Sequence, residues 1–182
     1  MGNKMTNAIP SKNIETQRLC LRAPRLEDRE TIFYMRSAPE VNTYIQRVPP
    51  TSLQQIDLFI KDRLLDRQVG ASIYWVITLK EDPDQYIGAI SLWQFSKDRK
   101  TAEVGYDLHP DYQGKGYMKE ALNAVVNIGF DTLDLHAIEA YTHQNNQPSK
   151  KLLEKFGFLL TDKKDDGVKE NVVYLIKTKK AF

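Results

Sequence analysis

Hydrophobic residues follow a helical spacing in one long segment of the first half of the chain. Within "TSLQQIDLFIKDRLLDRQ", which begins at Thr51, apolar side chains recur every three or four positions, and this spacing predicts an amphipathic helix. Ser52 and Gln55 have the spacing of a capping box, in which two side chains satisfy free N–H groups at a helix start. The segment therefore predicts a helix with a well-defined first turn.

Three segments after this helix have the spacing of strands. They are "SIYWVITL" from Ser72, "YIGAISLWQF" from Tyr86 and "TAEVGYDL" from Thr101. The polar connections between them, "KEDPDQ" and "SKDRK", are short, and short connections join neighbouring antiparallel strands. We expect an antiparallel meander.

The remaining segments alternate between the two patterns. "RLCLRA" from Arg18 predicts a strand and "LEDRETIFYMRS" from Leu26 predicts a helix. The second half predicts, in order, a helix from about Gly116 to Thr132, a strand from His136, a short helix from Pro148 ended by Gly157, and strands from Phe158 and Asn171. Residues 1–13 are polar and without a period, which predicts a flexible N-terminus. The simplest account is a single α/β (α+β) domain over residues 14–182, with about seven strands.

Composition narrows the class of protein. A hydrophobic content of 41% with 27% charged residues is that of a soluble globular chain. The net charge of +2 argues against a protein dedicated to nucleic acid or to membrane surfaces, although Lys177, Lys179 and Lys180 form a local basic patch. No apolar run approaches the ~20 residues that span a bilayer, and the N-terminus has no secretory pattern. We expect a cytoplasmic protein without membrane or nucleic-acid contacts, and the scattered histidines and single cysteine predict no metal site.

Two glycines stand where a strand gives way to a helix, in "HPDYQGKGYMKEAL" from His109. Gly114 and Gly116 match neither the P-loop nor the dinucleotide-binding fingerprint. Glycine nevertheless allows positive φ and close approach of a ligand, and the first turn of a helix has unpaired N–H groups that favour an anion. From spacing alone, an ordinary turn and a phosphate site built from backbone are equally open.

Three segments, in this order and spacing, carry a family resemblance. They are "ETQRLCLRAPRLED" from Glu15, "AEVGYDLHPDYQGKGYMKEAL" from Ala102 and "NNQPSKKLLEKFGF" from Asn145. With them the chain resembles the GNAT superfamily of acyl-CoA N-acyltransferases, and within it the RimJ/RimL-like branch of ribosomal-protein-alanine N-acetyltransferases. The resemblance implies the GNAT fold: a central mixed, mostly antiparallel twisted sheet flanked by helices and splayed near a slot for CoA. It also implies acetyl-CoA as the co-substrate.

The resemblance assigns the two-glycine turn to the pyrophosphate of CoA. The family keeps Gln or Arg three residues before the first glycine, whereas this chain has Asp111 there. An acidic side chain repels phosphate, so we expect Asp111 to face solvent or to cap the turn. The implied cradle consists of the backbone of Gln113, Gly114, Lys115, Gly116, Tyr117 and Met118, with charge from Lys115 at its rim.

Acetyl transfer to an amine needs a base, and Glu103 is our candidate. It lies on the strand that leads into the glycine turn, where alternation places it on one face with Gly105 and Asp107. A free Glu carboxyl has a pKa near ~4.3, against ~7.7–8.0 for a chain-terminal α-amine and ~10.4 for a lysine, so a carboxylate base suits an α-amine better. A solvated carboxylate without a catalytic role is the alternative.

The resemblance places backbone contacts to the pantetheine arm and to the oxyanion on the same strand. Tyr106, Asp107 and Leu108 are therefore expected cofactor contacts, near a bulge that splays two strands in many members of the family. Many GNAT enzymes protonate the leaving thiolate with a tyrosine in the late helix, but Leu153 occupies that position here.

The RimJ/RimL-like branch has Asn and Ser three residues apart instead, matched by Asn146 and Ser149. The resemblance implies that Asn146 binds the pantetheine amides and that Ser149 contacts the sulfur, as a catalytic residue beside Glu103. Both residues also fit a capping role, because Asn is a favoured N-cap and Pro148 suits the first helical turn.

The sequence therefore predicts an acetyl-CoA-dependent N-acetyltransferase that acts by direct transfer. A protein N-terminal α-amine is the first hypothesis for the acceptor, and a small amine such as a polyamine or an amine antibiotic is the second. A CoA-binding sensor without catalysis is the rival outside the enzymes. The oligomeric state stays open, a homodimer included, and we expect the segment from Pro39 to Arg67 to set the acceptor.

Overall fold

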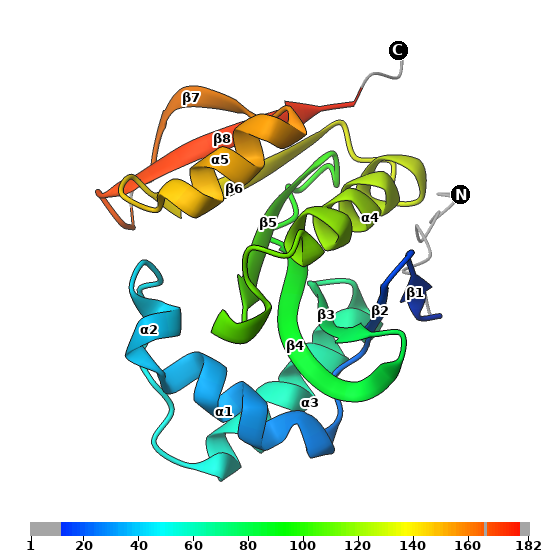
Figure 1. The fold of residues 1–182 in the computed structure, drawn as a ribbon. Coiled ribbons are helices and arrows are strands. Elements are labelled where there is room, and N and C mark those ends of the chain that lie inside the picture. The colour runs from blue at the N-terminus through cyan, green and yellow to red at the C-terminus, as the bar shows by residue number, and fades with distance from the viewer. Residues whose placement is uncertain (1–11, 166, 179–182) are drawn as a thin grey trace.

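The computed structural model describes residues 12–165 and 167–178, which form one open sheet with helices on both faces (Figure 1). The strands are β1 (Ile14–Glu15), β2 (Leu19–Arg22), β3 (Ile73–Leu79), β4 (Asp82–Trp93), β5 (Thr101–Leu108), β6 (Ala137–His143), β7 (Leu159–Lys164) and β8 (Asn171–Lys177). The helices are α1 (Arg29–Ser37), α2 (Pro39–Asn42), α3 (Leu53–Val69), α4 (Tyr117–Asp131) and α5 (Gln147–Phe156), with 3-10 turns η1 (Leu26–Asp28) and η2 (Pro110–Tyr112). The N-terminal segment expected to be flexible, apart from residues 12 and 13, lies outside the described residues, as do Lys179 and Lys180.

The sheet is mixed and mostly antiparallel, as predicted. Its order is β1-β2-β3-β4-β5-β6-β8-β7, and only the pair of β5 and β6 is parallel. The strand beyond the seven expected is β1, which at two residues is too short to show a period. β4 begins at Asp82, so most of the "KEDPDQ" connection is strand rather than loop, and its pairing with β3 shifts register between Thr78 and Leu79.

Apolar side chains form two cores on opposite faces of the sheet. On one face α4 and α5 pack over a core that includes Trp75, Leu122 and Leu153. On the other face α1 and α3 pack against Val76 and Ala89. No helix in the described residues is both long and apolar enough to cross a bilayer.

Local caps set the helix ends as the sequence predicts. In α3 the Ser52 hydroxyl accepts a hydrogen bond from the N–H of Gln55 at 3.4 Å, and the helix ends at Gly70 with φ 76°. In α5 the Asn146 side chain accepts from the N–H of Ser149 at 3.2 Å, and the helix ends at Gly157 with φ 104°. These contacts satisfy orphan backbone groups at the helix ends.

A buried ion pair joins two residues of the first segment that carries the family resemblance. The guanidinium of Arg22 donates to both carboxylate oxygens of Asp28, at 2.7 and 2.8 Å, and both side chains are only 2% exposed. Arg22 also donates to the carbonyl of Pro83 at 2.9 Å. The pair therefore joins β2 to the turn before α1 and to the start of β4.

The two parallel strands part after a short ladder. β5 and β6 pair from Thr101 opposite Ala137 to Glu103 opposite Glu139. Beyond this point β5 follows β4 and β6 follows β8, so the strands diverge and leave a fork (Figure 1). The predicted splay is confirmed. The expected bulge is not the cause, because the six pairs of the β4–β5 ladder run in unbroken register.

We expect Gly88→Ala to destabilise the fold. Gly88 in β4 lies so close to β5 that a Cβ would be 2.5 Å from the carbonyl oxygen of Asp107. Backbone cannot move aside without disturbing the ladder, so the free energy of unfolding should fall by about 1–3 kcal/mol in urea titrations.

Gly105→Ala is the matched control, because its Cβ would meet its nearest neighbours at an ordinary 3.6 Å. Its stability should equal or slightly exceed that of the wild type, since alanine restricts the unfolded chain more than glycine. Equal stability of the two variants would contradict the close approach of β4 and β5.

Candidate active site

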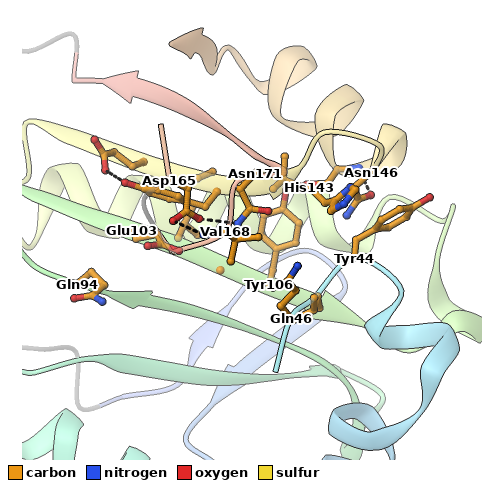
Figure 2. A pocket seen from close by; sticks show the side chains of 18 of the residues that line it. Tyr44, Gln46, Gln94, Glu103, Tyr106, His143, Asn146, Asp165, Val168 and Asn171 are labelled. Atoms are coloured by element: carbon orange, nitrogen blue, oxygen red, sulfur yellow. Dashed lines mark hydrogen bonds between the residues drawn. The ribbon is translucent and has the colours of Figure 1, made fainter. Parts of the chain in front are cut away.

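A cavity of about 570 Å³ lies at the fork between β5 and β6 (Figure 2). Side chains from β5, β6, the loop after α2, the start of α5 and the β7–β8 connection line it. Because the ladder ends at Glu103, side chains from both faces of the sheet can border the same space. The side chain of Glu103 points to the face of β5 opposite that of the buried Ala102 and Val104. Tyr106 lies on the same face as those two residues and packs on the core under α4 and α5.

Glu103 occupies the last position of β5 that pairs with β6. Burial raises the pKa of its carboxyl to about 7, and the carboxylates of Asp165 and Glu139 add to the rise. Lys163 and a hydrogen bond from Trp93 act in the opposite direction. A group with a pKa near neutral pH suits general-base catalysis, because it is both partly deprotonated and reasonably basic.

The neighbouring Glu139 is held in an ion pair. It accepts from the Lys163 ammonium at 2.6 Å and from the Tyr141 hydroxyl at 3.0 Å. Lys163 is thereby paired with Glu139, and it lowers the pKa of Glu103 by less than Glu139 raises it. Neither Glu139 nor Lys163 was a candidate from sequence, because they come from β6 and β7 and no local pattern places them beside β5.

Asp165 stabilises the turn that closes this side of the cavity. Its carboxylate accepts from the N–H of Gly167 at 2.9 Å and from the side-chain amide of Asn171 at 2.8 Å (Figure 2). Sequence reasoning missed the role of this turn as a wall of the cavity.

Tyr106 and Ser149 meet on the other side of the fork. The tyrosine hydroxyl lies 2.9 Å from the serine hydroxyl, and Asn146 caps the same helical turn. Burial raises the pKa of Tyr106 to about 12. Leu153, at the position of the tyrosine acid in other GNAT enzymes, is fully buried in the core.

The two-glycine turn has the geometry expected of an anion site. Gly114 and Gly116 adopt left-handed backbone with φ 74° and 80°. Gly116 is the N-cap of α4, so no side chain caps the first helical turn. A Cβ on Gly114 would meet no heavy atom of the described residues within 4 Å, which leaves room for a ligand. The turn therefore fits a phosphate bound by backbone N–H groups.

Asp111 faces solvent, as predicted from its unfavourable charge. Its side chain is 82% exposed. Lys115 donates to the carbonyl of Asp111 at 2.8 Å and lies 5.5 Å from the centre of the Tyr112 ring. The ammonium of Lys115 thus stays beside the turn.

Arg18 contacts this turn from a distant part of the chain, and no local pattern assigns it a role. Its guanidinium donates to the carbonyl of Lys115 at 3.0 Å, lies 4.5 Å from the centre of the Tyr117 ring and pairs with Glu120 at 2.8 Å. Glu120 also accepts from the N–H of Arg18 and from the hydroxyl of Thr16. These bonds hold the first turn of α4 against the strand β2.

Asp107 lies beyond the cavity and pairs with Arg47 at 3.1 Å. Burial raises the pKa of Asp107, and the charge of Arg47 partly offsets this effect. The pair joins the end of β5 to the loop whose Tyr44 and Gln46 line the cavity. Oδ2 of Asp107 is therefore occupied by Arg47, whereas Oδ1 is buried without a hydrogen-bond partner among the described residues.

The structure thus brings together some of the expected site residues and separates others. Glu103, Tyr106, Asn146 and Ser149 share the fork cavity. Asp107, Leu108 and the cradle residues 113–118 lie outside its lining. Within the part of the chain that the structure describes, no group of three or more His, Cys, Asp or Glu residues could hold a metal ion.

Comparisons with known proteins identify the family of the chain. A family model described as the acetyltransferase (GNAT) domain matches residues 18–159. An uncharacterized N-acetyltransferase of Bacillus licheniformis, p20, is 35% identical over 150 residues, covering 81% of this chain and 82% of the relative. A spermidine N(1)-acetyltransferase of Vibrio cholerae is 22% identical over 141 residues, covering 78% and 79%.

A solved structure shares the fold. RimL, a ribosomal L7/L12 α-N-protein acetyltransferase in complex with CoA, has a TM-score of 0.78 at 19% identity, covering 91% of this chain and 98% of that chain. The family match extends over most of the chain and includes β5, the glycine turn and α5. The chain therefore belongs to the GNAT family and is an acetyl-CoA-dependent N-acetyltransferase.

Proposed function

We propose that the protein acetylates a protein N-terminal α-amine by direct transfer, with Glu103 as the base and Ser149 as a hydrogen-bond donor to the leaving sulfur. The observation that carries this proposal is the fork cavity. It holds a largely buried carboxyl from β5 and a serine hydroxyl from α5 on its wall.

The lower pKa of an α-ammonium supports an α-amine as the acceptor. With Glu103 at about 7, proton removal from an α-ammonium at ~8 is uphill by about 1.4 kcal/mol, and from an alkylammonium at ~10.4 by about 4.6 kcal/mol. The difference of roughly 3 kcal/mol is more than a hundredfold in rate at equal binding. A small amine is the second candidate, because a spermidine acetyltransferase is among the relatives.

The glycine turn is the proposed seat of the CoA pyrophosphate. The N–H groups from Gly114 to Met118 would bind the phosphates, with Lys115 adding charge beside them, whereas the N–H of Gln113 already donates to the carbonyl of Pro110 at 3.1 Å. Backbone groups of Tyr106, Asp107 and Leu108 would contact the pantetheine arm, and the amide of Asn146 would bind its amides. Acetyl-CoA supplies the activated acetyl group.

Glu103 alone can accept both protons that the acceptor nitrogen loses during the transfer. An ammonium acceptor first loses one proton to solvent through Glu103, and the free amine attacks the thioester carbon. The attacking nitrogen then loses a second proton to Glu103 while the carbon–sulfur bond breaks and the sulfur leaves with the electron pair. A thiol has a pKa near ~8.5, so passing this proton from Glu103, at about 7, to the sulfur is favourable by about 2 kcal/mol. Ser149 donates a hydrogen bond and keeps its proton.

We expect Gly116→Val to weaken CoA binding about tenfold, because valine is strained at φ 80° and would distort the turn. Isothermal titration with CoA measures the change. Gly157→Val is the matched control, since Gly157 also has positive φ, at 104°, but ends α5 away from the turn. It should lose stability while keeping CoA affinity, and an equal loss of affinity in both variants would show that the cradle lies elsewhere.

Glu103→Gln should lower kcat at least ~100-fold, the usual contribution of a general base, and leave CoA affinity unchanged. In the wild type, kcat/KM should rise with pH through about 7 as Glu103 loses its proton. The variant should lack this step. Unchanged turnover in Glu103→Gln would remove Glu103 as the base.

A panel of acceptors tests the function itself. Consumption of acetyl-CoA is measured with peptides that have a free α-amine, with the same peptides N-formylated, and with spermidine and other small amines. Turnover with free peptides alone supports the proposal. Turnover with small amines alone favours the second candidate, and CoA binding without any consumption favours a sensor.

The raised pKa of Glu103 also predicts a pH dependence of stability. The folded protein binds this proton more tightly than the unfolded chain, whose carboxyl has a pKa near ~4.3. The resulting stabilisation is complete below ~4.3 and is lost as the pH rises through about 7. Relative to Glu103→Gln, the free energy of unfolding of the wild type should therefore fall by about 1 kcal/mol between about pH 5 and pH 8, measured by urea unfolding. The change is this small because solvent screens the partly exposed carboxyl. A pH-independent difference would contradict the shift.

A further inference from the structure

The hydroxyls of Tyr106 and Ser149 form a pair that the proposed chemistry does not yet use in full. They lie 2.9 Å apart, on β5 and α5, and both residues line the fork cavity. We propose that Tyr106 is a positioning residue that donates its hydrogen bond to Ser149 and thereby directs the serine proton toward the leaving sulfur. This inference rests on the proposed function of Ser149.

The direction of the hydrogen bond follows from the chemistry of the two hydroxyls. A phenol is a stronger donor than an aliphatic alcohol, because its lone pair is delocalised into the ring. Each hydroxyl has a single proton, so when Tyr106 donates, the proton of Ser149 is free for another acceptor. If Ser149 donated to Tyr106 instead, the serine proton would point to the phenol oxygen and the sulfur would receive no hydrogen bond from Ser149.

Both ends of Ser149 are then fixed. Its N–H donates to the side chain of Asn146 at 3.2 Å, which sets the first turn of α5. Its hydroxyl oxygen is held by Tyr106, which sets the side-chain rotamer. The O–H bond is the remaining freedom, and it can point into the cavity.

Tyr106 remains a neutral donor over the working pH range. Burial is the main cause that raises its pKa to about 12. The leaving thiolate would not take a proton from such a phenol. Its conjugate thiol has a pKa near ~8.5, so the transfer would be uphill by more than three pKa units. Tyr106 and Ser149 therefore stabilise the thiolate by hydrogen bonding, while its proton comes from Glu103.

The pair also explains how the site works with leucine in the late helix. Leu153 lies one turn after Ser149 and is fully buried, so α5 offers no phenol at that position. Here a phenol from β5 contacts the helix instead, across the gap that the parting of β5 and β6 creates.

A double-mutant cycle tests the inference. Tyr106→Phe removes only the hydroxyl and should lower kcat about fivefold, the usual worth of one hydrogen bond, with less than about twofold change in KM for acetyl-CoA. Ser149→Ala should lower kcat at least as much. The double variant should match Ser149→Ala, because Tyr106 acts only through the serine. The pH step near 7 should stay in place in all three, since Glu103 is intact.

Tyr74→Phe is the matched control. Tyr74 is also a partly buried tyrosine whose hydroxyl contacts another hydroxyl, that of Tyr86 at 3.1 Å, but it packs with the core under α1 and α3. It should keep wild-type kcat. Wild-type kcat in Tyr106→Phe, or effects that multiply in the double variant, would overturn the inference while leaving acetyl transfer intact.

A binding measurement separates this inference from the choice of acceptor. At about pH 8.5 the thiol of free CoA is partly ionised, so the wild type should bind CoA a few-fold more tightly than desulfo-CoA, which lacks the sulfur. Both Tyr106→Phe and Ser149→Ala should reduce this ratio toward one. Because no acceptor is present, an unchanged ratio in Tyr106→Phe overturns its role even if every acceptor fails.

Discussion

The short parallel ladder between β5 and β6 is the constraint on which the site depends. The strands pair at three positions and then part, while each keeps its antiparallel partner on the other side. The sheet therefore stays whole and yet opens at its middle. A parallel neighbour also requires a crossover, and α4 provides it. Its first turn must lie where β5 ends, so the fork and the glycine turn are two results of one connection.

The fork brings together chemistry from both faces of the sheet. Glu103 borders it from the last paired position, and Tyr106 borders it three residues later from the opposite face. In a continuous sheet these two side chains would lie on different sides of a hydrogen-bonded layer. Because the layer ends between them, a carboxyl and a hydroxyl pair can act on opposite sides of one reacting bond.

Buried charge is stabilised in two different ways around this opening. Glu139 is paired with the Lys163 ammonium at 2.6 Å, just as Asp28 is paired with Arg22 elsewhere in the fold. Glu103 instead has a raised pKa, because burial and two neighbouring carboxylates disfavour its charged form. An ion pair would have made Glu103 a weaker base. Lys163 pairs with Glu139 and not with Glu103, so the pKa of Glu103 stays near neutral pH, where the carboxyl can act as a base.

Features that depend on neighbouring residues were predictable. The caps at Ser52 and Asn146, the terminating Gly157 and the alternation along β5 all act within a few positions, and the structure has each of them. The strand β1 and the extended start of β4 were missed, because two residues show no period and polar residues can pair at a register shift. The expected bulge was wrong for the β4–β5 ladder.

The sequence by itself determined the family, the two-glycine turn and the candidates Glu103, Asn146 and Ser149, since residue type and local spacing carry that information. Only the tertiary structure decided which distant residues contact them. Arg18 reaches Lys115 and Glu120 from about a hundred positions away, and Tyr106 reaches Ser149 over 43 positions. Such contacts, and the pKa of Glu103 with them, depend on strand order and on where one parallel ladder stops, and no local pattern records either.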